Sequence, residues 1–293
     1  MISGNWSAPS SPVSMAGEAR VVVEITSCLV VTKFLLAAWS LLSAAEWFFN
    51  LHIFRRNGLL SWAVLRLRPN LICTPAIRQY VHSEGVVISV LLCRIAAALA
   101  LLAPYPGPAD LPSSIIILLS CFYISRRTWF GGDGSDQMGM VIAAGTAIMS
   151  AGIAFNDNDL ALSGVLAIGG QATLAYFVAG AAKLVSPVWR DGSALMGVMK
   201  TQSYGHPSAV YFGEHRPRFC SFVCWTTIVT EMLFPLILFA PPALAMGALL
   251  CFTAFHFSNA YFMGLNAFVW PFLATYPSLM VANSLMRHWL GWA

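Results

Sequence analysis

Lys183 lies where an apolar stretch meets a polar one, a position at which a lysine can do chemistry. It follows the small-residue-rich run LAYFVAGAA that begins at Leu174, and Pro187 comes four residues later. Two interpretations remain open. The side chain can snorkel, with its alkyl stem in lipid and its ammonium group at the headgroups. Alternatively, the side chain is desolvated and accepts a proton during catalysis.

Two carboxylates lie in a glycine-rich loop, RRTWFGGDGSDQM, between Arg126 and Met138. Asp133 and Asp136 come directly before a new apolar run, where aspartate commonly caps the N-terminus of a helix. The catalytic interpretation is that the glycines let this loop fold into a cavity, where the carboxylates act as base partners or bind a cation. The sequence leaves both interpretations open.

A third group of polar residues lies near the C-terminus. His256, Asn259 and Asn266, together with Met263, recur at helical intervals and would share one helix face about 80° wide. Polar residues on one stripe of a membrane helix are expected to point into the protein. They either form interhelical hydrogen bonds, worth about 1 kcal/mol each, or border a ligand site.

The residues around Lys183 resemble the core motif of the membrane domain of vitamin K-dependent γ-carboxylase, within the wider "horizontally transferred transmembrane" (HTTM) domain family. The matching residues are Tyr176, Phe177, Ala179, Gly180, Lys183, Leu184, Trp189, Asp191 and Gly192. Residues Phe255 to Pro277 resemble a second motif of the family, whose polar face borders the quinone pocket. The two motifs occur in the expected order.

The resemblance implies that Lys183 is the base that deprotonates a reduced quinone, either menaquinone or vitamin K hydroquinone. It also implies that the cofactor-binding residues include Tyr176, Trp189, His256, Asn259 and Asn266. In the family, the loop that corresponds to Arg126–Met138 carries a histidine that assists the lysine. Here the loop has no histidine, and Asp133 or Asp136 would take its place as a proton acceptor. The spacing from the lysine to the tryptophan is also one residue longer.

Two functions follow, and the sequence does not decide whether the protein is an enzyme. The first is a quinol- and oxygen-dependent enzyme whose substrate is small or is presented by a partner protein or peptide, because the chain leaves no room for a large soluble domain. The second is a non-enzymatic membrane module that binds lipid or quinone, or that assists the maturation or export of a peptide. A transporter is disfavoured because the sequence shows no internal inverted repeat.

Composition predicts an all-α integral membrane protein. Of the 293 residues, 58% are hydrophobic and only 10% are charged, against about 25% charged in soluble proteins. Apolar runs near 20 residues indicate a bundle of about 7–8 transmembrane helices in a lipid bilayer, in a bacterial inner or cell membrane. The net charge of +4 comes from arginines beside these runs, so we expect no nucleic-acid partner. No cluster of residues predicts a metal site.

The chain reads as a disordered tail over residues 1–20 and a single domain over 21–293. The expected spans are roughly 22–46, 85–104, 112–127, 137–155, 161–184 and 219–240, followed by two within 243–284. Amphipathic interfacial helices are expected within 48–84 and 185–217, where arginines alternate with apolar residues. Lys33 and Arg94 fall inside spans and need partners: Glu24 or Glu46 for Lys33, and an acidic residue of a facing helix for Arg94.

The orientation in the membrane stays open. The arginines follow the first, third and fifth spans, so the positive-inside rule puts the Lys183 and Asp133 loops in the cytoplasm. The resemblance implies the opposite side, because the active site of the carboxylase faces the lumen.

Overall fold

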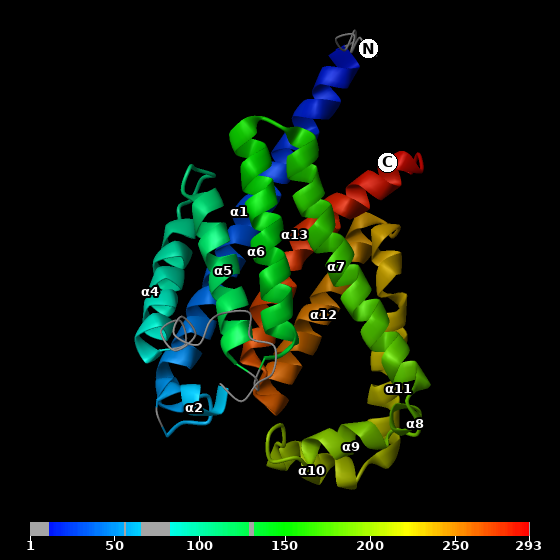
Figure 1. Cartoon of the computed structure of the whole chain (residues 1–293). Helices are drawn as coiled ribbons and strands as arrows, with labels where there is room; N and C mark the ends of the chain where they lie inside the picture. The colour runs from blue at the N-terminus through cyan, green and yellow to red at the C-terminus, as the bar shows by residue number, and fades with distance from the viewer. Residues whose placement is uncertain (1–11, 56, 66–82, 129–131, 293) are drawn as a thin grey trace, which may run out of the picture.

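The computed structural model describes residues 12–55, 57–65, 83–128 and 132–292. All regular structure in these ranges is helical (Figure 1), which confirms the predicted all-α class. The long helices are α1 (Pro12–Phe49), α4 (Glu84–Leu101), α5 (Asp110–Arg127), α6 (Gly134–Phe155), α7 (Asn158–Val185), α11 (Pro217–Leu233), α12 (Pro242–Met263) and α13 (Asn266–Trp289).

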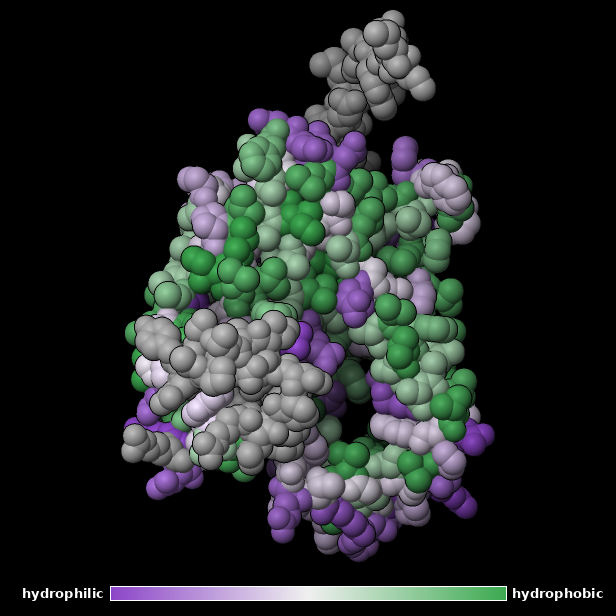
Figure 2. All heavy atoms as spheres, viewed as in Figure 1, coloured by the Kyte–Doolittle hydropathy of each residue, from purple (hydrophilic) through white to green (hydrophobic). Residues whose placement is uncertain are grey.

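Six of the described helical segments are long and apolar enough to cross a membrane: Val22–Phe49, Glu84–Leu101, Gly134–Phe155, Asn158–Val185, Pro217–Leu238 and Pro242–Met263. On the face shown in Figure 2, hydrophobic residues cover most of the middle, and hydrophilic residues gather at the upper and lower ends. This arrangement fits an integral, multi-pass membrane protein. Helices α5 and α13 coincide with predicted spans but are not among the six, so the count of 7–8 stays a prediction.

Helix α1 begins inside the segment 1–20 that was predicted to be a disordered tail. It starts at Pro12, whereas residues 1–11 lie outside the described residues. Proline is favoured at the first helical position, and residues 15–20 contain alanine, methionine, glutamate and arginine, which are good helix formers. The helix of the apolar span therefore extends back into the polar segment.

Short helices lie within both regions that were predicted to be interfacial. In the first region they are η1 (Leu51–Phe54) and α2 (Trp62–Leu65), and the arginines at 56, 66, 68 and 78 lie outside the described residues. In the second they are α8 (Pro187–Arg190), α9 (Ser193–Met199) and α10 (Pro207–Glu214). In Figure 1, α9 and α10 lie across the lower end of the long helices.

Helix α13 occupies the centre of the bundle and packs against α1, α6, α7 and α12. Beside it, α6 and α7 form a close antiparallel pair through small residues. A methyl group added at Gly164 of α7 would lie 2.6 Å from the Gly145 carbonyl oxygen and 2.8 Å from the Met149 backbone nitrogen of α6. The absence of a side chain at Gly164 therefore sets the distance between these two helices.

We expect Gly164→Ala to lower the free energy of unfolding by about 1–3 kcal/mol, because overpacking must push two backbones apart. Gly170→Ala on the same helix is the matched control, since a methyl group there meets nothing within 4 Å. Urea unfolding in detergent micelles measures both variants. Equal stability of the two variants would contradict the close helix contact.

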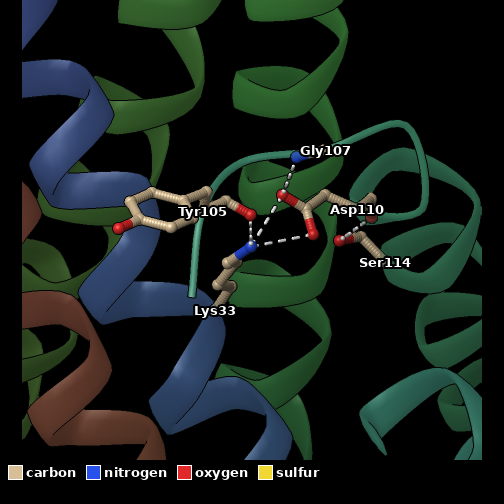
Figure 3. A network of polar contacts seen from close by, with 5 residues as sticks. All are labelled: Lys33, Tyr105, Gly107, Asp110 and Ser114. Atoms are coloured by element: carbon tan, nitrogen blue, oxygen red, sulfur yellow. Dashed lines mark hydrogen bonds and ion pairs between the residues drawn. The ribbon is translucent and has the colours of Figure 1, made fainter. Parts of the chain in front are cut away.

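A buried ion pair joins α1 to the start of α5 (Figure 3). Lys33 Nζ lies 2.9 Å from Asp110 Oδ2 and 3.0 Å from Asp110 Oδ1, and it also donates to the Tyr105 carbonyl oxygen at 2.8 Å. The exposed fractions of the Lys33 and Asp110 side chains are 0% and 2%. The predicted partners Glu24 and Glu46 are therefore wrong, because the chain turn before α5 brings Asp110 to Lys33.

Candidate functional site

One face of α7 carries three residues of the predicted motif. Tyr176, Gly180 and Lys183 follow one another at intervals of four and three residues, so they line up along the helix. Tyr176 and Gly180 are buried, and Lys183 is partly exposed in the last turn before the helix ends at Val185. This face packs against α11 and meets His256 of α12.

Lys183 forms an ion pair with Glu231 of α11. Its Nζ lies 2.6 Å from Glu231 Oε2, and the side chains are 20% and 5% exposed. The same ammonium group lies 5.2 Å from the centre of the Trp189 ring, within cation–π range. Lys183 is therefore not an isolated snorkelling cation, because it has both a carboxylate and an aromatic partner.

Gly180 explains how α11 comes close enough for this pair. A methyl group at Gly180 would lie 2.7 Å from the Met232 backbone nitrogen and 3.0 Å from the Glu231 Cβ. The helix backbones therefore touch one turn before Lys183, which brings the Glu231 carboxylate to the lysine. The sequence analysis does not assign Glu231 to the site. An acidic residue inside an apolar span was the signal that could have identified it.

The helix α8 positions Trp189 beside Lys183. Trp225 Nε1 of α11 donates a hydrogen bond to the Arg190 carbonyl oxygen at 3.0 Å, which fixes α8 against α11. Gly192 then turns the chain with a φ of +86°, a conformation that favours glycine. Asp191 accepts a hydrogen bond from the Ser193 backbone N–H at 2.8 Å, and the hydrogen bonds from Ser193 lower the pKa of Asp191.

A second polar pair involves Tyr176, which lies about two turns before Lys183 on α7. The Tyr176 hydroxyl and His256 Nε2 are 2.6 Å apart, and both side chains are buried. The His256 ring stacks on Phe272 at 4.5 Å between centroids, and the Tyr176 ring stacks on Phe234 at 4.0 Å. His256 Nδ1 is buried and has no hydrogen-bond partner in the described part of the chain.

The other polar residues of the third group do not join this pair. Helix α12 ends at Met263, and Gly264 closes it with a φ of +70°, so Asn266 begins α13. The expectation that all four residues share one helical face is therefore wrong for Asn266. Asn259 is partly buried and Asn266 is exposed. The two segments predicted within 243–284 correspond to the helices α12 and α13.

Asp133 and Asp136 lie at the start of α6, away from the two polar pairs of α7. Asp133 is the N-cap of α6, because its Oδ1 accepts from the Ser135 N–H at 2.8 Å and the Asp136 N–H at 3.3 Å. The capping interpretation is thus confirmed for Asp133, whereas Asp136 lies in the first turn of α6. Both aspartates line a cavity that also contains Arg94. Among the described residues, neither carboxylate forms a hydrogen bond or ion pair with Lys183.

Aromatic rings lie between the Asp133 loop and His256. A methyl group at Gly134 would lie 3.3 Å from the Phe268 ring, which stacks on Phe272 with a centroid distance of 6.1 Å. Phe272 in turn stacks on His256. The two polar regions are therefore separated by packed aromatic side chains of α13.

No group of three potential ligands among the described His, Cys, Asp and Glu residues is arranged to hold a metal ion. The thiols of Cys220 and Cys224, one helical turn apart on α11, face backbone carbonyl oxygens of Gly213 and Gly192 instead. Comparisons with protein-family models, with curated proteins and with solved structures find no match for this chain.

Proposed function

We propose that this multi-pass membrane protein is a quinol- and oxygen-dependent enzyme of the HTTM type, in which Lys183 is the base. The observation that carries the proposal is the Lys183–Glu231 pair on the same helix face as the Tyr176–His256 pair. Two polar pairs inside an apolar bundle are costly, and membrane proteins usually keep such groups for function.

The residues present fit a quinone head group. The Tyr176 ring packs against the rings of Phe252 and Phe272, which would give a quinone ring aromatic neighbours, and buried His256 Nδ1 remains able to hydrogen-bond a ligand hydroxyl or carbonyl. Figure 2 shows a hollow between the bundle and the segment that contains α9 and α10, with α7 and α11 on one side of it in Figure 1. This hollow offers a path from the lower end of the bundle towards α12.

The Lys183–Glu231 pair can manage the proton. A proton that moves from Lys183 Nζ to Glu231 Oε2 along their hydrogen bond leaves an amine that can accept a second proton from a quinol hydroxyl. A hydroquinone bound here would supply four electrons to O₂, two from its oxidation to the quinone level and two from epoxidation of the ring double bond, so that one oxygen atom would enter the epoxide and the other would leave as water. The substrate that benefits from this chemistry is small or is presented by a partner protein or peptide.

A second candidate is a non-enzymatic module that binds lipid or quinone, or that assists peptide maturation or export. One observation favours it: the Lys183 ammonium already has a carboxylate partner and an aromatic neighbour. Such an ion pair needs no reaction to explain it, because it satisfies both charges within the bundle.

Quinol oxidation by purified protein in liposomes tests the proposal. Reduced menaquinone and vitamin K hydroquinone are supplied with O₂, and the epoxide is measured by mass spectrometry. We expect epoxide from the wild type and a loss of about 100-fold or more in Lys183→Arg, because arginine keeps the positive charge but cannot give up its proton. Lys200→Arg, at an exposed lysine, should retain full activity.

Two other outcomes would contradict these expectations. Full activity in Lys183→Arg would remove Lys183 as the base. No epoxide from folded wild-type protein would overturn the enzyme proposal and favour the non-enzymatic module.

A further inference from the structure

A cavity of about 260 Å³ lies where the end of α5 and the start of α6 meet the middle of α4, apart from the Lys183–Glu231 pair. Its polar lining residues include Arg94, Ser125, Thr128, Asp133, Asp136 and Gln137. Gly132 and Gln137 are exposed, so the cavity reaches the surface of the described structure. Its volume is below the range of about 300–1,000 Å³ that is usual for drug-sized ligands, so a smaller molecule fits it.

Arg94 is the unusual member of this lining. It is only 1% exposed, yet its Nε and Nη2 atoms have no hydrogen-bond partner among the described residues. Its guanidinium group lies over the Trp39 ring at 4.6 Å, which fixes the plane of the group. A buried donor without an acceptor destabilises the fold, so two such donors on one side chain indicate an acceptor outside the described protein.

The two unpartnered nitrogens define the shape of that acceptor. Nε and Nη2 form one edge of the planar guanidinium group, and their two N–H bonds point the same way. This edge matches the two oxygens of one carboxylate in a bidentate contact. A carboxylate is therefore the best complement to Arg94.

The opposite charge lies across the cavity. Asp136 and Arg94 interact electrostatically, but none of the ion pairs among the described residues includes either of them. The Asp136 carboxylate is partly exposed and accepts from the backbone N–H of Asp133, which leaves it able to accept from a further donor, while Asp133 uses its Oδ1 to cap α6. A ligand that contacts both sides needs an anionic group for Arg94 and a cationic donor for Asp136.

We propose that this cavity binds a small zwitterion of the α-amino acid class, with its carboxylate on Arg94 and its ammonium group on Asp136. The site is separate from the quinol site proposed above, and its occupancy does not depend on that proposal. The α-amino acid head group carries both charges one carbon apart, and the cavity is too small for a large charged ligand such as a lipid.

The test uses the full-length protein in detergent micelles. Each of the twenty proteinogenic amino acids is added at millimolar concentration, the shift in Tm is measured, and the best ligand is titrated by calorimetry. Two analogues of that ligand follow: the α-hydroxy acid, which lacks the ammonium group, and the amide, which lacks the carboxylate. We expect the amino acid to bind and each analogue to bind at least 10-fold more weakly.

Variants on the two sides of the cavity separate binding from folding. Asp136→Asn keeps the shape of a partly exposed side chain, and it should weaken binding about 10-fold or more with little change in the Tm of the free protein. Arg94→Met should also abolish binding, and Lys200→Arg, at an exposed lysine outside the cavity, should bind as the wild type does.

Three results would overturn the proposal. The first is that no amino acid binds. The second is that the hydroxy acid binds as tightly as the amino acid, which indicates a site for simple anions. The third is that the amide binds as tightly as the amino acid, which indicates a site for cations.

Discussion

Lys33→Met is expected to lower the free energy of unfolding by about 3–5 kcal/mol, since it strands the buried Asp110 carboxylate. Both side chains are almost fully buried, and Lys33 satisfies both Asp110 oxygens and the Tyr105 carbonyl oxygen. Asp110 Oδ2 also accepts from the Gly107 N–H at 3.0 Å, so the pair fixes the turn before α5 to α1 (Figure 3). Unfolding in mixed micelles, followed by circular dichroism, measures the loss.

Two further variants separate the buried charge from other causes. Lys33→Met combined with Asp110→Asn should recover most of the stability, because the asparagine is neutral and still accepts from Gly107. Lys200→Met removes a lysine from an exposed pair with Glu214, and it should change stability little because solvent screens that pair. A double variant as unstable as Lys33→Met alone would contradict the ion-pair explanation.

Most of the helical framework could be predicted from the sequence. Apolar runs near 20 residues mark helices regardless of their neighbours, so each of the eight predicted spans corresponds to a described helix. The N-cap role of Asp133 was also predictable, because capping depends on residues next to it in the chain.

Partners across the bundle could not be predicted in the same way. Lys33 pairs with Asp110 rather than with an acid of its own helix, and Lys183 pairs with Glu231, which lies 48 residues later. Such pairs depend on which helices pack together and at what distance, and Gly180 sets that distance for the Lys183–Glu231 pair. The predicted helix face also failed at Asn266, because Gly264 ends α12 before that residue.

The residues predicted to form one site lie in two regions of the structure. Lys183, Trp189, Tyr176 and His256 were expected in one site, and the structure brings Lys183 to Trp189 and Tyr176 to His256. Asp133 and Asp136 come together with Arg94 instead. Arg94 was expected to pair directly with an acid of a facing helix, but the described structure separates it from Asp136 by a cavity.

The Lys183–Glu231 pair should respond unequally to the loss of either partner. We expect Lys183→Met to destabilise the protein by about 3 kcal/mol, because Glu231 is 5% exposed and is left as an unpaired buried carboxylate. Glu231→Gln should cost only about 1 kcal/mol, since the glutamine oxygen still accepts a hydrogen bond. Lys183 is also 20% exposed and keeps the Trp189 ring as a neighbour. Unfolding in mixed micelles compares the two variants.

Combining Lys183→Met with Glu231→Gln should recover the stability that Lys183→Met loses, because the buried charge is gone. This double variant folds without an amine at position 183, so its epoxide yield reports on chemistry rather than on folding. If the double variant is stable and inactive while the wild type is active, the Lys183–Glu231 pair is needed for the reaction itself. If the double variant instead loses as much stability as the two single variants together, the two side chains are not coupled. The proton path through Glu231 would then have to be abandoned.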